Sequence, residues 1–271
     1  MIYITGDTHG QIEEFKERVE SLNLTREDIV IVCGDFGFNW DAQHISDWKR
    51  FEHAYTVLFC DGNHENYDVL NALKTKEMYG DTVGVFDTNT FRLLTGHMYD
   101  IAGVKTFVYG GASSIDKEWR LDNEVAYGKL WWKEEVPSPE AFELARQTLK
   151  KHDYKFDLFL SHTCRPELKG EVLGSYKAGF PDPVEDMIKA LEEEIKENGG
   201  SWKMHCFGHF HSDKAYKDYC CLYRGILKWV RNPSERAGKG SAKGQVSARF
   251  YEAEAIKKTL AQLERVKIKT K

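Results

Sequence analysis

The sequence predicts an α/β protein, and two observations lead to that class. Short apolar runs alternate with amphipathic stretches through the first third of the 271 residues, which is the pattern of βαβ units. Polar residues of the kinds that bind metal ions follow five of the apolar runs along the chain. Loops at the carboxyl ends of strands build the sites of open α/β sheets, so these residues are expected to meet at one edge.

Three strands, each followed by a helix, are predicted in the first third. The strands cover residues 2–5, 28–33 and 56–60, and the helices cover 11–22, 45–54 and 66–74. The strand segments are short and rich in aliphatic residues, whereas the helix segments place apolar residues three and four positions apart.

From Thr82 the pattern changes to closely spaced short strands, at residues 83–86, 91–95 and 105–109, and we expect a second sheet to start there. Ser138 is a predicted N-cap followed by Pro139, and Asp182 with Pro183 opens another helix that ends at residues 198–200. Two further strands are predicted at 157–160 and 203–207.

Charge and composition divide the chain into a body, residues 1–230, and a tail, residues 231–271. The tail holds eleven Lys or Arg and four Glu, a net charge of +7, and the body holds 27 basic and 39 acidic residues, a net charge of −12. Residues 231–248 are predicted to be a linker and 251–266 a helix. The basic tail is expected to touch nucleic acid or the acidic body, or to be simply solvated.

No apolar run is long enough to cross a membrane, and the first residues enter a strand at once, so we expect no signal peptide and a cytoplasmic protein. Cys33, Cys60 and Cys206 end buried-looking runs, which favours free thiols and a reducing compartment. Cys220 and Cys221 are not a zinc pair, because neighbours in a strand point to opposite faces.

Carboxylate, amide and imidazole groups supply the candidate ligands. They lie in five segments: Asp7-Thr8-His9, Gly34-Asp35, Gly62-Asn63-His64-Glu65, Ser161-His162 and Gly208-His209-Phe210-His211. This donor mix suits Mn, Fe, Zn or Ni, and a shared carboxylate allows two ions to sit close together. Any one of these residues alone would be an ordinary polar residue at a strand end. Seven in order favour a site for two divalent metal ions and a hydrolytic reaction.

These segments resemble the signature of calcineurin-like metallophosphoesterases, which runs D-x-H, G-D-x-x-D, G-N-H-[DE], a single His, and G-H-x-H. Four of the five pieces match in full, between positions 7 and 211. Residues 110–120 are similar to a stretch of bacterial and phage-type members. The resemblance implies two mixed β-sheets packed as a sandwich and flanked by helices.

The resemblance also implies which residues hold the metals. Asp7, His9, Asp35 and His211 would hold one ion, and Asp35, Asn63, His162 and His209 would hold the other. Asp35 would therefore bridge the pair. A turn after a strand can aim both side chains of D-x-H at one ion, and an extended H-x-H would present both imidazoles on one side.

The implied reaction is attack of a metal-bridging hydroxide on the phosphorus of a phosphate mono- or diester. His64 would be catalytic rather than a ligand, by protonating the leaving oxygen or stabilising the transition state. Lys117 and Arg120 are candidate phosphate-binding residues. Trp119, Trp131 and Trp132 have two interpretations, stacking on a base or packing in a lid.

One position departs from the signature, since Phe38 stands where the second Asp of G-D-x-x-D belongs. In protein Ser/Thr phosphatases of the superfamily that Asp pairs with the catalytic His, and the next residue, an Arg, binds phosphate. This chain has neither that Asp nor that Arg, so the protein Ser/Thr phosphatase branch is the weaker alternative. Asp41 and Asp68 are candidates to orient His64 instead.

Two other functions share parts of this residue pattern. A metallo-β-lactamase would need His at position 214, which is Lys. A metal-binding interaction module on the same fold, without catalysis, stays open. A nucleotide or nucleic acid is the expected substrate, from the basic tail and the Trp-rich insert, and the sequence does not predict an oligomeric state.

Overall fold

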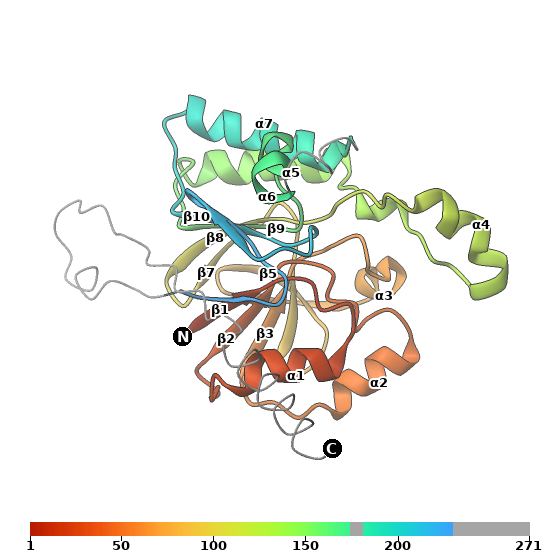
Figure 1. Cartoon of the computed structure of the whole chain (residues 1–271). Coiled ribbons are helices and arrows are strands. Elements are labelled where there is room, and N and C mark those ends of the chain that lie inside the picture. The colour runs from red at the N-terminus through yellow and green to blue at the C-terminus, as the bar shows by residue number, and fades with distance from the viewer. Residues whose placement is uncertain (174–180, 230–271) are drawn as a thin grey trace, which may run out of the picture.

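The computed structural model describes residues 1–173 and 181–229 and shows two mixed sheets packed together with helices on both outer faces (Figure 1). The predicted fold class is confirmed. The predicted linker and the helix at 251–266 lie outside the described residues.

The first sheet contains seven strands in the order β13-β1-β2-β3-β6-β5-β4. Its strands are β1 (Ile2–Thr5), β2 (Ile29–Val32), β3 (Thr56–Phe59), β4 (Lys74–Met78), β5 (Asp81–Val85), β6 (Thr90–Leu93) and β13 (Ile226–Trp229). The four central strands, β1, β2, β3 and β6, run parallel. β13, β5 and β4 are antiparallel to their neighbours. The parallel centre aligns the carboxyl ends of β1, β2 and β3 at one edge.

The second sheet contains six strands in the order β11-β12-β10-β9-β8-β7. They are β7 (Met98–Ile101), β8 (Val104–Tyr109), β9 (Leu158–Ser161), β10 (Met204–Phe207), β11 (Lys214–Tyr216) and β12 (Tyr219–Cys221). Here β8, β9, β10 and β12 run parallel. The carboxyl ends of β9 and β10 therefore also share an edge.

The helices cover the outer faces of the two sheets. They are α1 (Ile12–Glu20), α2 (Ala42–Arg50), α3 (Tyr67–Asn71), α4 (Lys117–Tyr127), α5 (Pro139–Lys151), α6 (Lys169–Leu173) and α7 (Pro183–Glu197), with two 3₁₀ turns at Lys133–Glu135 and Pro166–Leu168. α1 and α2 pack on the first sheet through Phe15 and Trp48, and α5 and α7 pack on the second through residues such as Leu149 and Leu191. The facing sides of the sheets form one large apolar core.

The boundary between the sheets was predicted wrongly. Strands β5 and β6 lie where we expected a second sheet to start, but β6 pairs parallel with β3 and extends the first sheet. The second sheet begins only at Met98, with a strand that the sequence pattern did not indicate. Closely spaced strands in the sequence show where the alternation of strands and helices ends. They do not show which sheet each strand joins.

The predicted helix at 66–74 is also too long. α3 ends at Asn71, and Lys74 already begins the edge strand β4. Four of the five β4 residues are exposed, so the strand has no apolar alternation from which to predict it. The helix starts at Ser138 and Asp182 are confirmed, since both side chains accept a hydrogen bond from the first turn of the helix that follows.

All six cysteines are free and buried, as predicted for the three that end apolar runs. Cys220 faces the core between the sheets, whereas Cys221 packs with Phe207 on the other side of the strand. Within residues 1–173 and 181–229, no helix combines the length and apolarity that a bilayer crossing requires.

A buried polar network ties α7 to the second sheet. The Glu192 carboxylate is fully buried and accepts hydrogen bonds from Tyr219 (2.8 Å) and Arg165 (3.0 Å). Its other oxygen lies 3.1 Å from Nδ1 of His205, whose Nε2 lies 2.6 Å from the Ser161 hydroxyl. Burial alone would raise the pKa of Glu192, but the contacts with His205 and Tyr219 hold this pKa below its usual value. His205, which matches no motif, is thus a core histidine next to the strand end that carries His162.

We expect Glu192→Ala to lower the free energy of unfolding by about 3–5 kcal/mol, because it leaves buried charged and polar partners without their acceptor. Chemical denaturation measures the change. Glu193→Ala is the matched control, since the Glu193 side chain is half exposed, and it should alter stability by no more than about 0.5 kcal/mol. Equal effects of the two substitutions would contradict the assigned role of the network.

Candidate metal centre

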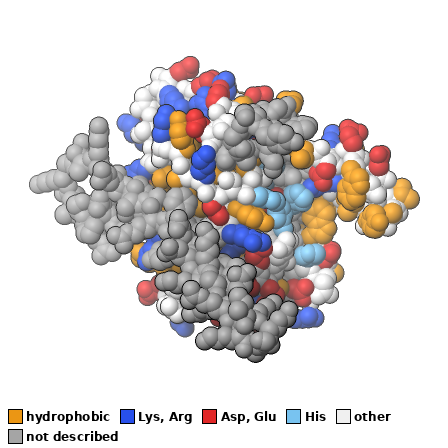
Figure 2. Space-filling model, in the orientation of Figure 1, with side chains coloured by type: hydrophobic (Ala, Val, Ile, Leu, Met, Phe, Trp, Pro, Cys, Tyr) orange, Lys and Arg blue, Asp and Glu red, His pale blue; other side chains and the backbone are white. Residues whose placement is uncertain are grey.

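The loops after β1, β2, β3, β9 and β10 meet at one edge of the two sheets, and all seven predicted ligands lie there. They are Asp7, His9, Asp35, Asn63, His162, His209 and His211. Figure 2 shows histidine side chains gathered at the middle of this face. The carboxylates are buried, and His211 is half exposed, so the site opens to solvent on its His211 side.

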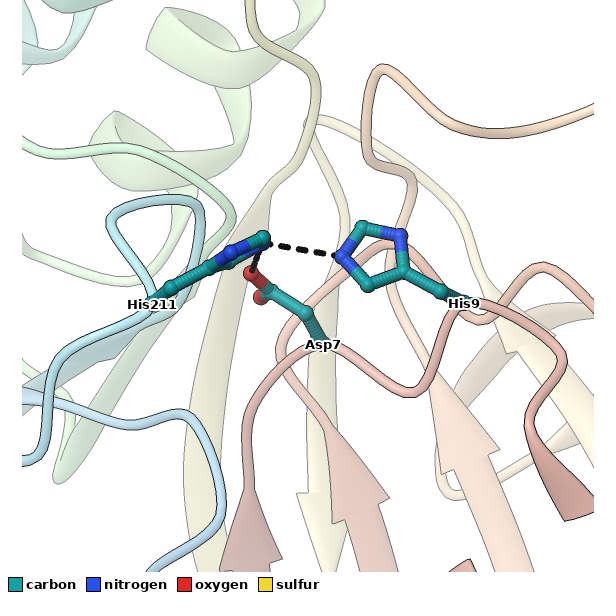
Figure 3. A group of neighbouring side chains, drawn as sticks. All are labelled: Asp7, His9 and His211. Atoms are coloured by element: carbon teal, nitrogen blue, oxygen red, sulfur yellow. Dashed lines mark hydrogen bonds and ion pairs between the residues drawn. The ribbon is translucent and has the colours of Figure 1, made fainter. Parts of the chain in front are cut away.

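The first group of ligand-type side chains consists of Asp7, His9 and His211 (Figure 3). Nε2 of His211 lies 2.9 Å from Nε2 of His9 and 3.2 Å from Oδ2 of Asp7. The His211 ring stacks on Tyr223 with 4.5 Å between ring centroids, which fixes its plane. Three nitrogen and oxygen donors within reach of one point form a partial coordination shell.

The second group lies deeper and consists of Asp35, Asn63, His162 and His209. Oδ1 of Asn63 lies 3.1 Å from Nε2 of His162 and 3.0 Å from Nδ1 of His209. Nε2 of His162 also lies 3.2 Å from Oδ1 of Asp35. The other Asp35 oxygen lies 3.7 Å from Nδ1 of His9, so this carboxylate stands between the two groups.

The backbone of four predicted ligand residues is in the left-handed region, where residues other than glycine are uncommon. The φ angles are +47° at His9, +50° at Asp35, +64° at His209 and +49° at His211. The prediction of an extended H-x-H segment is therefore wrong, because the chain turns at both histidines. The turns send His209 to Asn63 and His211 to Asp7. Such strain persists at functional sites where the surrounding structure holds it.

Two glycines of the motifs are required for space. A Cβ atom at Gly62 would lie 2.2 Å from Oδ1 of Asp35, and one at Gly208 would lie 2.0 Å from Oδ1 of Asp7. These carboxylate oxygens accept backbone hydrogen bonds from His64 (2.7 Å) and His209 (2.9 Å). The motif glycines thus let the chain pass directly over the two acids.

The electrostatics of the site follow from its two buried carboxylates. Burial alone would raise the pKa of Asp35, but the positive charge of His162 and its other histidine neighbours hold it well below its usual range. Burial would lower the pKa of His162, but Asp35 and Asp7 raise it to about 10. Burial and the charge of His162 lower the pKa of His209 to about 3. The carboxylates therefore require positive charge beside them, while His209 keeps a free lone pair.

The residues present fit divalent metal ions. Oδ2 of Asp7 is buried and accepts no hydrogen bond of acceptable geometry from the described residues. Nε2 of His9 and Nε2 of His211 face each other at a distance where only one of them can donate. A buried oxygen without a donor and two facing ring nitrogens are what a coordination site presents, and a cation would satisfy all three.

His64 lies beside the ligands. Its ring is 4.9 Å from that of His9 between centroids, and its nitrogens are within reach of His9 and Asp35. A terminal nitrogen of Arg120 lies 2.8 Å from Nε2 of His64, and the other donates to the Asn63 carbonyl at 3.2 Å. Burial, together with the charge of Arg120, lowers the pKa of His64.

The other residues singled out from the sequence lie away from this ring. Lys117 sits over the Trp131 ring, with its nitrogen 4.2 Å from the centroid. Asp41 caps α2 and contacts the ring of His44, and Asp68 pairs with Lys129 at the surface. Neither acid is within bonding distance of His64 in the described part of the chain. The side chain that contacts the His64 ring is that of Arg120, and not that of Asp41 or Asp68.

Several residues around the ligands were not identified from the sequence. Glu65 accepts hydrogen bonds from the backbone of Phe36 (2.8 Å) and Gly37 (3.2 Å), so it holds the loop that carries Asp35. Arg18 donates to the carbonyl of Asp7 at 2.7 Å. Ser114 accepts from Asn63 at 3.2 Å and donates to Glu135 at 2.6 Å. Only Glu65 belongs to a signature segment, and nothing in the local sequence marks the others.

A family model described as calcineurin-like phosphoesterase matches residues 1–213 of the chain. This chain belongs to the calcineurin-like phosphoesterase family. The match includes all five loops of the phosphoesterase, since the last ligand-type residue is His211. No curated protein matches it. One solved structure, described as a novel archaeal phosphodiesterase, is 12% identical, covers 84% of this chain and 92% of its own, and has a TM-score of 0.31. A likeness of that size adds nothing to the assignment.

Asp35→Asn is expected to weaken Mn²⁺ binding to the phosphoesterase more than tenfold, because it removes the charge of the carboxylate between the two groups. Calorimetric titration of metal-stripped protein measures the affinity and the number of ions bound. Asp68→Asn, at an exposed acid paired with Lys129, should bind like the wild type. Unchanged affinity and stoichiometry in Asp35→Asn would show that the ions bind elsewhere.

Proposed function

We propose that this phosphoesterase uses two divalent metal ions to hydrolyse phosphate mono- or diesters of nucleotides or nucleic acids. The observation that carries the proposal is the convergence of seven ligand-type side chains from five loops, in two groups with Asp35 between them. Ligand chemistry supports Mn²⁺ first, with Fe, Zn or Ni as other choices. Six free buried cysteines support a cytoplasmic location.

Asp7, His9, Asp35 and His211 would hold one ion, and Asp35, Asn63, His162 and His209 the other. When bound, such ions activate a water molecule and offset the negative charge that develops on the phosphoryl oxygens. The residues of the chain would fix the positions of the donor atoms. Asp35 is held by the His64 backbone N–H, and Asn63 by the Ser114 hydroxyl. The Cys33 carbonyl lies 2.7 Å from Nδ1 of His162. That contact leaves Nε2 of His162 facing Asp35 and Asn63.

His64 is proposed to act on the leaving oxygen. One terminal nitrogen of Arg120 lies 2.8 Å from Nε2 and 3.2 Å from Nδ1 of His64. Because Arg120 only donates hydrogen bonds, Nε2, at the shorter distance, is assigned as the acceptor, and the proton of the neutral ring is placed on Nδ1. The ring can then donate a hydrogen bond to a group beside it. Arg120 is 3% exposed and also held by Asp116 at 2.9 Å, so it serves to orient His64 rather than to reach out for phosphate. Lys117 stays a candidate for phosphate contact.

Two alternatives have less support. In the protein Ser/Thr phosphatase branch an Asp beside the catalytic histidine would occupy position 38, but Phe38 is fully buried against Phe36 and Trp48. A non-catalytic metal-binding module would not require a histidine oriented by a buried arginine. The nucleotide or nucleic-acid substrate is supported by the basic tail and by the aromatic residues near His64.

Hydrolysis of p-nitrophenyl phosphate and bis-p-nitrophenyl phosphate with Mn²⁺ tests the activity. We expect His64→Ala to lower kcat by about 10²–10³-fold, because it removes a hydrogen-bond donor to the negative charge that develops on the leaving oxygen, while the metal content stays the same. His152→Ala, a change at the end of α5, should leave kcat unchanged. Wild-type protein that binds two ions but releases no nitrophenol from either ester would favour the interaction module.

The tail is expected to contribute sequence-independent affinity for nucleic acid. Removing residues 231–271 takes away a net charge of +7, so hydrolysis of a single-stranded oligonucleotide should weaken and lose most of its dependence on salt. Reaction rates between 50 and 200 mM salt measure this, with p-nitrophenyl phosphate hydrolysis as the control that should not change. An unaltered salt dependence would exclude the tail from substrate binding.

A further inference from the structure

A pocket of about 220 Å³ adjoins the candidate metal centre on the His64 side. It is lined by His9, Gly37, Trp40, His44 and His64. His9 and His64 belong to the centre already described, but Trp40 and His44 have no part in the proposed chemistry. Because His64 borders the pocket and is proposed to act on the leaving oxygen, a group in the pocket would be on the leaving side of the ester.

Trp40 is held firmly at this position. Its backbone N–H donates to Gly37 at 3.1 Å, and its carbonyl accepts from Asn66 at 2.8 Å. The indole makes an edge contact with Trp132, with 5.6 Å between ring centroids. Its centroid lies 6.5 Å from that of His64. A planar group that stacks on Trp40 would therefore remain close to His64.

His44 adds a polar group to the same pocket. Its Nδ1 lies 2.8 Å from the Asp41 carboxylate, which also accepts a hydrogen bond from the His44 backbone at 2.9 Å. A carboxylate only accepts, so the proton sits on Nδ1, and Nε2 is left to accept a hydrogen bond. Gly10 gives the ring room, since a Cβ atom there would lie 2.5 Å from Cδ2 of His44.

The size of the pocket limits what it can hold. Sites for whole drug-sized ligands enclose about 300–1,000 Å³, so this pocket takes one ring system rather than a complete dinucleotide. An aromatic wall and one fixed acceptor suit a flat ring with a donor at its edge. We infer that the pocket binds the nucleobase of the leaving nucleoside, with Trp40 stacking on the base and His44 bonding its polar edge. This inference rests on the proposed function.

Binding of adenosine 5′-monophosphate and of ribose 5-phosphate to the full-length, Mn²⁺-loaded protein tests the inference. The two ligands share the sugar phosphate and differ in the base. By calorimetry we expect the wild type to bind the nucleotide about 5–100-fold more tightly, as stacking of one base provides. Trp40→Ala should bind both ligands equally, and Trp40→Phe should recover most of the preference because it restores an aromatic ring.

Trp119→Ala is the matched control, since Trp119 is 57% exposed on α4 and does not line the pocket, and it should keep the full preference. Should Trp40→Ala not fold, His44→Ala on the surface of α2 provides the test, and it should lose part of the preference. Equal wild-type affinity for the two ligands, or an unchanged preference in the folded Trp40 or His44 variant, would overturn the inference.

Hydrolysis of p-nitrophenyl phosphate, measured on the same preparations, separates this inference from the proposed function. Protein that hydrolyses the ester but shows no preference for the nucleotide overturns the base pocket alone. Protein that prefers the nucleotide but hydrolyses nothing supports the base pocket and overturns the proposed catalysis.

Discussion

The structure around the candidate metal centre depends on two carboxylates, Asp7 and Asp35, that are buried where water cannot solvate them. Buried negative charge is costly unless cations or hydrogen-bond donors compensate it, and the surrounding residues supply both. Backbone N–H groups of two motif segments point at these oxygens, and His162 acquires a high pKa beside them. Among the described residues, Oδ2 of Asp7 receives no hydrogen bond of acceptable geometry, so positive charge beside this oxygen would stabilise the site, and a divalent cation would supply it.

The two sheets are what make this arrangement possible. Asp7, Asp35 and Asn63 come from the first sheet, and His162 and His209 come from the second, so the site crosses the sandwich at the edge where the parallel strands of both sheets end. Neither sheet carries a complete ligand set alone. Loss of packing between the sheets would therefore separate the two halves of the site. The apolar core between the sheets thus holds the site residues together as well as stabilising the fold.

The sequence predicted the ligand-type residues and the strand ends on which they lie, because both are local properties of short segments. It did not predict which sheet takes β5 and β6, since pairing depends on contacts between distant segments. It also placed His209 and His211 in extended backbone, although both have positive φ, because the strain is imposed by partners such as Asp7 and Asn63. The contacts of Arg18, Ser114 and Glu135 could not be predicted for the same reason, since they join segments that meet only after folding.

The presence of Phe38 where the signature has an Asp changes how His64 can be held beside the candidate metal centre. An aspartate would accept a hydrogen bond from the ring and favour a protonated imidazole, whereas Arg120 donates one and favours a neutral ring. Phe38 has a structural role of its own. It packs with Phe36 and Trp48 and stabilises the loop that contains Asp35. The arginine also donates to the Asn63 carbonyl, so it fixes the segment that contains both a predicted ligand and His64. In this chain His64 is therefore oriented by Arg120 on α4 rather than by an acid in the Asp35 loop. The position of α4 thus affects the geometry of the site.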